Sequence, residues 1–415
     1  MIRSAGKILM LVENYFPQDT RVKNEASLLT DAGYQVTVIA LRRKGQAGRE
    51  TLNRIEVYRL PTLELFKKTP SANVNRLNLL FVKLKAFLGY VVEYCYFTAA
   101  CLIVSTYIFV SRGFDVIHAH NPPDTLFLVA LPFKLLGKKF VFDQHDLCPE
   151  LYRSRYCAAE GFYTRILRMF EWCSLKLADI TIATNESYKQ IQFKRANKNP
   201  RDVFVVRNGP NQMRMTPVAP SARLKEMNKF ILCYIGSLNP QDGVDYLLRS
   251  LRHLLHDLKC SDFHCVIMGT GDSLQDLRDL AEKLQLNGCI ELLGFVSDED
   301  LQANLAAADI CVDPDPSSPL NDVSTWIKVM EYMAYAKPIV AFDLKETRFS
   351  AGDAAVYVRP NKEAEFAEAI AQLMAQPELR KQMGAYGRRR VEHELQWNTV
   401  GKNLLTAYET LLAEK

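Results

Sequence analysis

The sequence has no CxxC pair and no other cysteine spacing typical of a zinc site or a disulfide framework, although it contains ten cysteines. Most of these cysteines lie within apolar runs, which fits structural thiols in a reducing cytosol. The first residues lack the length and the small-residue cleavage site of a signal peptide. We therefore interpret the short apolar run at 7–13 as a first β-strand and expect a cytoplasmic protein.

Internal repeats and low-complexity tracts are also missing, so a solenoid is not expected. No GxGxxG follows the first predicted strand, where VENYFPQDT (12–20) stands instead, and this disfavours a dehydrogenase. The composition is ordinary for a folded protein, with 48% hydrophobic and 24% charged residues. The length of 415 residues exceeds what one hydrophobic core usually organises, which predicts two domains.

The net charge of +5 is unevenly distributed along the chain. Residues 1–200 contain 28 Lys and Arg against 17 Asp and Glu, whereas residues 201–415 contain 24 against 30. A basic first half predicts contact with an anionic partner. Uneven charge on a solvated surface is the alternative. Nucleic acid is a weaker candidate, because the cations are scattered rather than aligned along one predicted element.

Apolar runs alternate with helical patterns, which is typical of βαβ units and a parallel sheet. The run at 7–13, a helix over Asp19–Gly33 and a second run at 35–41 form the first unit. Further strands are predicted at 114–120, 138–146, 179–185 and 202–209, and after the linker at 230–237, 263–272, 290–295 and 309–314. The expected domains are an acceptor-side domain at 1–209, a linker at 210–228, a nucleotide-sugar-binding domain at 229–395, and a helix at 396–415 that returns to the first domain.

The segment 86–110 is apolar over 25 residues with the single charge of Glu93, and it is long enough to span a bilayer. A spanning orientation would place strands of one sheet on opposite sides of the membrane, so we expect a buried or interfacial helix. Lys83 and Lys85 precede this segment and Arg112 follows it. These cations predict peripheral contact with anionic lipid through 79–112, on the cytoplasmic face.

The stretch PDPSSPLNDVSTWIKVMEYMAYAKPIVAFD (314–343) resembles the signature region of retaining family-4 glycosyltransferases. In this family a helix carries a glutamate, here Glu331, before a "kPiVa" strand, and Lys328 lies one turn earlier. We expect this helix to start at Ser324 and Thr325, whose backbone N–H groups can bind diphosphate oxygens, and a carboxylate accepts hydrogen bonds from ribose hydroxyls. An amphipathic helix with incidental charges is the alternative.

The resemblance extends over nearly the whole chain, and it implies a GT-B fold of two facing Rossmann-like domains with a deep cleft between them. HAHNPPDTL (118–126) and QHDLCPELY (144–152) most resemble the branch of the family that assembles polysaccharides. The donor-binding residues that the resemblance implies are Arg207, Asn208, Gly236, Gly271, Phe295, Ser324, Thr325, Lys328 and Glu331.

Two departures from the family pattern concern charge. The first of the family's paired glutamates is replaced by Val323, with Asp322 adjacent as a candidate for its role. The usual Arg and Lys of the loop GSLNPQDG (236–243) are replaced by Asn239 and Asp242. The diphosphate charge must then be balanced elsewhere. The candidates are Lys328, Arg21 and Arg207.

Three histidines follow predicted strand ends of the first domain, where the ligands of doubly wound sheets bind. His120 and His145 are candidates to hydrogen-bond the donor sugar or to stabilise developing charge, with His118 beside them. Structural histidines are the alternative. The remaining candidates are Asp19 and Arg21 in the loop after the first strand, Asp146 as a catalytic residue, and Glu150 on the acceptor side.

These features predict a hexosyl- or N-acetylhexosaminyl-type glycosyltransferase of the EC 2.4 class. It would move a sugar from a nucleotide diphosphate, with UDP as the expected carrier, to a lipid-linked or polysaccharide acceptor in cell-surface glycan synthesis. DPD (313–315) matches the metal-binding DxD string but is interpreted as a loop, so neither a metal nor a cofactor is expected. A nucleotide-sugar epimerase of the same architecture and a non-catalytic sugar-nucleotide-binding scaffold remain as alternatives.

Overall fold

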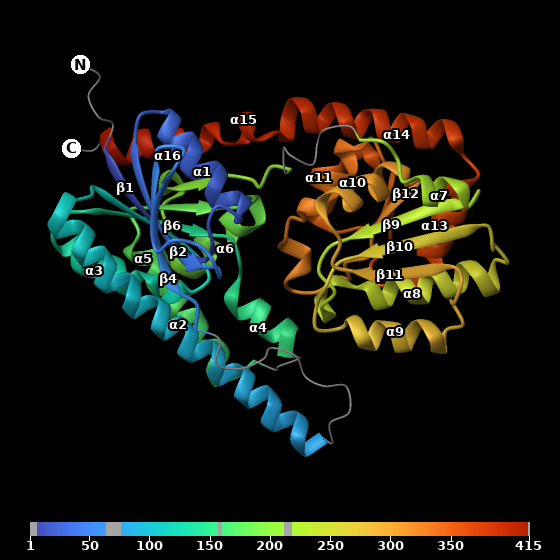
Figure 1. Cartoon of the computed structure of the whole chain (residues 1–415), viewed down its shortest axis with the longest axis horizontal. Coiled ribbons are helices and arrows are strands. Elements are labelled where there is room, and N and C mark those ends of the chain that lie inside the picture. Colours follow the sequence, from blue (N-terminus) through green and yellow to red (C-terminus); the bar gives the residue numbers. More distant parts are fainter. Residues whose placement is uncertain (1–5, 64–75, 157–159, 211–217, 414–415) are drawn as a thin grey trace. The chain divides into compact units, whose positions relative to one another are not determined.

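The computed structural model describes residues 6–63, 76–156, 160–210 and 218–413, although the side chains of residues 76–88, Tyr90 and Tyr156 lie outside the description. The chain divides into two units, which are coloured by sequence in Figure 1. The first unit combines the residues up to Asn208 with Val400–Lys415. The second unit contains Gly209–Thr399. Each is an α/β unit with its own sheet, as the sequence predicts.

The first sheet has eight strands in the order β3-β4-β2-β1-β5-β6-β7-β8. All neighbours are parallel except β3 and β4. The strands are β1 (Lys7–Tyr15), β2 (Gln35–Arg42), β3 (Arg49–Leu52), β4 (Ile55–Pro61), β5 (Val116–His120), β6 (Lys139–Gln144), β7 (Ile180–Ala183) and β8 (Val203–Val205).

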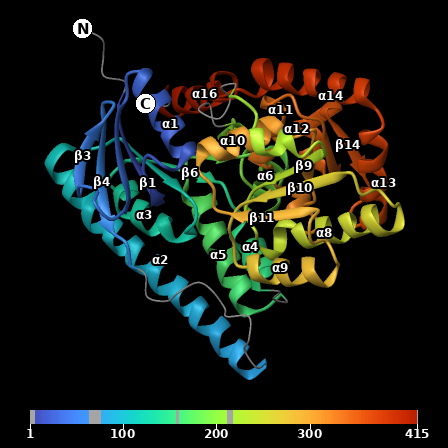
Figure 2. The ribbon, with the colours of Figure 1, turned by 45° about the vertical axis from the view of Figure 1, so that its right-hand side comes forward.

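Helices cover both faces of this sheet (Figures 1 and 2). One face holds a core to which α2, α3, α5 and α6 contribute, and α1 and α16 cover the other face. The helices are α1 (Thr20–Asp31), α2 (Arg76–Arg112), α3 (Phe127–Leu135), α4 (Cys148–Tyr156), α5 (Phe162–Leu177), α6 (Glu186–Ala196) and α16 (Lys402–Ala413).

The hairpin of β3 and β4 was not anticipated from the sequence. Its two-residue turn places Asn53 and Arg54 at φ angles of 47° and 69°. This geometry matches the right-handed twist of antiparallel strands and normally calls for glycine at the second position. A hairpin is usually recognised from an alternating apolar strand and a glycine in its turn. Here β3 is short and largely polar, and Arg54 takes the place of the glycine.

The second sheet has six parallel strands in the order β11-β10-β9-β12-β13-β14. Its strands are β9 (Phe230–Ile235), β10 (Phe263–Met268), β11 (Ile290–Gly294), β12 (Ile310–Asp313), β13 (Ile339–Phe342) and β14 (Ala355–Val358). Its helices are α7 (Ala222–Glu226), α8 (Val244–Arg252), α9 (Leu274–Lys283), α10 (Asp298–Ala307), α11 (Ile327–Ala334), α12 (Lys345–Ala351), α13 (Glu363–Met374), α14 (Pro377–Arg390) and α15 (Trp397–Val400), the last of which ends at the junction with the first unit.

Both sheets reverse their strand order next to their first strand. In the second sheet the chain moves outward from β9 to β11 and then restarts on the other side of β9 with β12. In the first sheet the same reversal occurs between β1 and β5. Ligands of such sheets bind outside the carboxyl ends of the strands that flank the reversal. The strand orders therefore identify two candidate sites, one in each unit.

Candidate functional site

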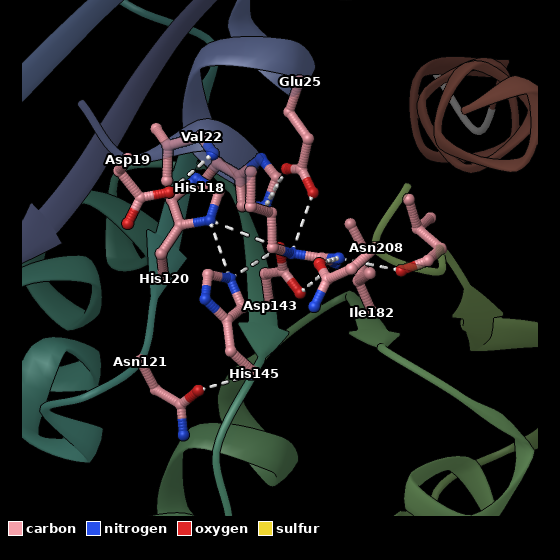
Figure 3. A network of polar contacts seen from close by, with 12 residues as sticks. Asp19, Val22, Glu25, His118, His120, Asn121, Asp143, His145, Ile182 and Asn208 are labelled. Carbon is pink, nitrogen blue, oxygen red and sulfur yellow. Dashed lines mark hydrogen bonds and ion pairs between the residues drawn. The ribbon is translucent and has the colours of Figure 1, made fainter. Parts of the chain in front are cut away.

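The carboxyl ends of β1, β5 and β6 bring together a buried polar cluster in the first unit (Figure 3). Asp143 on β6 is its centre. Arg21 on α1 donates from Nε and Nη2 to the two oxygens of Asp143, each over 2.9 Å. His145 Nε2 lies 3.0 Å from Asp143 Oδ2, and His120 Nδ1 lies 3.2 Å from the same oxygen. The predicted residues Arg21, His120 and His145 thus meet around one carboxylate.

The charges in this cluster follow from burial and from Arg21. Burial opposes ionisation of Asp143, but Arg21 and the two neighbouring imidazoles hold the pKa of this carboxyl well below its usual value. Burial raises the pKa of Glu25 well above its usual range, and the charge of Asp143 adds to this effect. Burial and the neighbouring charges thus shift the pKa values of these two carboxyl groups in opposite directions beside one guanidinium.

The histidines of β5 are fully buried and differ in their partners. His118 Nδ1 lies 2.9 Å from the hydroxyl of Tyr408 on α16, and its ring stacks on that of His120 at 4.2 Å between centroids. Burial lowers the pKa of both imidazoles, so they are neutral near pH 7. His145 is the histidine of this group that reaches the surface, with 17% of its side chain exposed.

Four members of the cluster are of the types that bind metal ions. One ligand atom from each of Glu25, His118, His120 and Asp143 lies within 4.8 Å of the other three. The guanidinium of Arg21, however, contacts both carboxylates, at 2.9 Å from Asp143 and 3.1 Å from Glu25. Arg21 thus supplies the positive charge that a metal ion would provide, so the donor set does not fit a resident cation.

The other predicted residues of the first unit have partners within that unit. Asp19 caps α1 by accepting from Val22 N over 3.0 Å. Glu150 on α4 is buried and pairs with Arg195 at 2.6 Å, so its carboxylate is directed into the fold. Burial raises the pKa of Asp146, whose backbone N–H donates to Asn121 Oδ1.

Arg207 and Asn208 were expected to contact the donor. Asn208 lies in the first unit and accepts a hydrogen bond from Arg21 Nη1 over 2.7 Å. Arg207 is buried. The structure therefore joins Asn208 to the Asp143 cluster through Arg21.

Glycines allow the loops after β9 and β10 to pack against each other in the second unit. A Cβ on Gly269 would lie 1.7 Å from the carbonyl oxygen of Gly236, and a Cβ on Gly271 would lie 2.3 Å from that of Leu238. Any side chain at these positions would separate the loops. Gly236 and Gly271, both predicted donor-site residues, thus lie in two loops whose backbones are in contact at the carboxyl edge of the sheet.

Lys328 projects from α11 to the carboxyl end of β12. Its Nζ lies 3.2 Å from Asp313 Oδ1 and also contacts Asp315, and both aspartates are buried. Burial works against the charge of Lys328, but Asp315 and Tyr234 raise the pKa of this ammonium well above its usual value. DPD was interpreted as a loop at the end of a predicted strand over 309–314. Asp313 ends β12, Pro314 and Asp315 follow it outside any helix or strand, and both carboxylates contact the lysine.

The helix that carries Glu331 begins later than expected. The sequence placed Ser324 and Thr325 at the helix start, whereas α11 begins at Ile327. The reason is a short 3-10 turn over Asn321–Val323, after which Ser324 is extended and its hydroxyl donates to Leu320 O over 2.8 Å. Glu331 is buried on α11, in the turn after Lys328.

Two further predicted residues lie near this edge. Asp322 is half-buried and accepts from the Ser317 hydroxyl over 3.2 Å. Phe295 directly follows β11, and 86% of its surface is exposed, so its ring is available for stacking on a flat ligand. The second unit thus brings the ends of β9, β10 and β12 together, and Phe295 lies at the end of the neighbouring strand.

Among the residues at these two sites, the sequence did not predict Asp143, Glu25, Tyr408, Asp313 or Asp315. Asp143 could have been recognised as a charge inside the apolar run KKFVFDQHD. Glu25 follows Arg21 by four residues on the same predicted helix, a spacing that pairs opposite charges. Tyr408 gave no such signal, because it meets His118 from 290 residues away.

The chain is similar to known proteins over both units. Residues 18–212 match a sequence profile described as Glycosyltransferase Family 4, and residues 229–376 match one described as Glycosyl transferases group 1. The GPI3 subunit of phosphatidylinositol N-acetylglucosaminyltransferase from Saccharomyces cerevisiae is 22% identical over 73% of this chain and 61% of its own length. The chain spans between 38% and 61% of the first curated relatives it matches.

Solved structures share the fold at low sequence identity. Sucrose-phosphate synthase from Thermosynechococcus elongatus superposes with a TM-score of 0.73 at 17% identity, covering 99% of this chain and 100% of its own. Anabaena Alr3699/HepE, solved with UDP and glucose, has a TM-score of 0.69 at 16% identity, with coverage of 98% and 100%. This likeness confirms the predicted fold class.

Proposed function

Because the chain belongs to glycosyltransferase family 4, we propose that it transfers a sugar, with retention of configuration, from a nucleotide-diphosphate sugar to a lipid-linked or polysaccharide acceptor. The observation that carries this proposal is the strand reversal between β9 and β12. Gly236 follows one of these strands, and the loop that leads to Lys328 and Glu331 follows the other. A ligand at this edge meets residues of the family signature.

We assign donor recognition to this edge. Glu331 would accept hydrogen bonds from the ribose, and Phe295 would stack on the base. Lys328 lies where the diphosphate is expected, and Asp313 and Asp315 hold its ammonium in place. The complex of UDP and glucose with HepE supports a UDP-sugar as the donor. Hexosyl and N-acetylhexosaminyl donors both fit this proposal.

In the first unit we assign contact with the sugar to His145, the histidine of the cluster that reaches the surface. Asp143 and His120 would orient it, since both lie within 3.2 Å of its Nε2. A hydrogen bond from this ring would stabilise charge that develops during transfer. The departing phosphate would accept the acceptor proton, so a separate strong base is not required.

The first experiment is a thermal-shift screen of the full chain against UDP-, GDP- and ADP-sugars, because a ligand that binds only the native state raises its stability. A UDP-sugar should raise the melting temperature of the protein. Transfer is then measured with a radiolabelled donor and a membrane lipid extract. Stabilisation without transfer would favour the scaffold alternative, and conversion of the free nucleotide sugar without an acceptor would favour the epimerase.

The donor site is tested by Glu331→Gln, with Glu368→Gln on an exposed part of α13 as the matched control. Loss of a charged hydrogen bond should weaken donor binding by about 1.5–3 kcal/mol in calorimetry. The control should bind as the parent does. Unchanged donor affinity in a folded Glu331→Gln protein would remove this residue from the site.

A further inference from the structure

The outer faces of three neighbouring helices in the first unit are unusually apolar. Helices α2, α3 and α5 contribute to one core on the same face of the sheet, and α3 contacts both of the others. Figure 1 shows α2 and α3 along this face, with α5 behind them. Their outward side chains include most of the exposed large apolar residues of the described chain.

The exposed residues follow the helical repeat, so each helix presents one apolar stripe. On α2 the stripe contains Ile103, Tyr107 and Val110, of which Val110 is 82% exposed. On α3 it contains Leu128, Leu131 and Leu135, and on α5 it contains Phe162, Met169 and Trp172. Apolar stripes of this kind normally pack against another part of the protein, a partner protein or a membrane.

Helix α2 is neither an ordinary core helix nor a spanning one. Its segment Val91–Arg112 is the one described helix that is long and apolar enough to cross a membrane, yet only 28% of its most apolar window is buried. The inward side of the same segment places Phe97, Cys101 and Ile108 in the core of the sheet. A helix anchored in this way cannot leave the sheet to cross a bilayer, but its outer half can enter an interface.

The charges on these helices have one sign wherever they reach solvent. Arg165 and Lys176 on α5 are exposed, as is Arg112 on α2, whose guanidinium also pairs with Glu56 on β4. The acidic residues of the described parts of α2, α3 and α5 are Glu93 and Glu171, and both are buried. An apolar surface bordered by cations complements an anionic lipid leaflet. The aromatic rings of Tyr107 and Trp172 suit the headgroup region.

We propose that the outer faces of α2, α3 and α5 together form a docking surface for an anionic membrane leaflet. The sequence alone suggested 79–112, and α3 and α5 extend that contact beyond α2. A second copy of the chain fits this surface less well, because a two-fold interface would pair this surface with itself and the exposed charges of its helices are all positive. Membrane docking does not depend on the proposed sugar transfer, and the two can fail separately.

The test is flotation of the full chain with vesicles of phosphatidylcholine alone or with 30% phosphatidylglycerol. The parent should bind the anionic vesicles, and binding should weaken as salt increases. The variant Leu135→Ser/Phe162→Ser/Trp172→Ser should lower the bound fraction at least about tenfold, because it removes an apolar contact from two helices. Leu258→Ser/Leu379→Ser, two exposed leucines of the second unit, is the matched control.

The charge contribution is tested by Arg165→Gln/Lys176→Gln, with Lys283→Gln/Lys381→Gln in the second unit as control. The first pair should lose affinity for anionic vesicles and reduce the salt dependence, whereas the control should do neither. Since all these side chains are exposed, an unchanged melting temperature verifies folding. Equal binding by the apolar triple variant and the parent would overturn the proposal. The proposal would also be overturned if the parent sedimented as a dimer without binding vesicles and the triple variant sedimented as a monomer.

Discussion

Asp143 remains charged in the interior because every oxygen of its side chain has a cationic or polar donor. Arg21 supplies two of these contacts and the histidines supply the rest. Glu25, at the same depth, has its pKa raised well above the usual range by burial and by the charge of Asp143. The pKa values of two carboxyl groups beside one guanidinium thus shift in opposite directions, and this difference has measurable consequences.

Replacing Asp143 with Asn should cost about 3 kcal/mol of unfolding free energy, because Arg21 would lose its buried counter-charge. Glu25→Gln, by contrast, replaces a carboxyl whose pKa is raised by burial with an amide of the same shape and should cost less than about 1 kcal/mol. Urea unfolding followed by circular dichroism measures both variants. Equal losses in the two proteins would contradict the charge assignment.

Asp124, in the turn after β5, offers a test through pH. Burial and the charge of Glu171 raise the pKa of this carboxyl from its usual 3.8 to about 7. The folded state therefore binds the proton more tightly, so the stability contributed by this group is present at low pH and is lost as the pH rises to about 7. Asp124→Asn mimics the protonated acid and should gain up to about 4 kcal/mol over the parent between pH 4 and pH 8.

Denaturant unfolding of parent and variant across this pH range gives the difference directly. Asp31→Asn, at an exposed ion pair with Arg54, is the control and should differ from the parent by a pH-independent amount below about 1 kcal/mol. A stability difference between Asp124→Asn and the parent that does not change with pH would show that Asp124 is ionised throughout.

At the scale of elements, apolar runs bounded by polar residues were enough to locate most strands. Strand β6 ends at Gln144 and β5 at His120, where the sequence placed candidate ligand residues. The start of α11 was misplaced by three residues, because propensity does not reveal a 3-10 turn stabilised by Ser324. The β3–β4 hairpin was not anticipated either, since its turn depends on tertiary context rather than on glycine.

The sequence predicted the site residues that follow strand ends. It did not predict which charged side chains form ion pairs with one another. The sequence identified His120 and His145 because they follow apolar runs. It could not show that Glu150 pairs with Arg195, or that Lys328 is held by two aspartates, because such contacts join different elements of the fold. Partners of buried charges are determined by packing, which periodicity does not encode.

At the scale of the whole molecule, we expect donor binding and transfer to survive excess EDTA. Lys328 and backbone N–H groups would supply the positive charge at the donor edge, and Arg21 supplies it in the first unit. Transfer assays and calorimetry with and without the chelator measure this. Activity that disappears with EDTA and returns with manganese would instead assign a metal to the transfer reaction. Zinc recovered stoichiometrically from the purified protein would point to Glu25, His118, His120 and Asp143.

The return of Val400–Lys415 to the first unit also determines the order in which the protein is completed on the ribosome. Translation from Asn208 to Val400 takes roughly 10–40 s at common elongation rates. During this interval the second unit gains all its residues, whereas the first lacks the helix that carries Tyr408 to His118. The half of the protein that is made first is therefore the half that is finished last, and a stalled or truncated nascent chain would expose the incomplete sheet to chaperones.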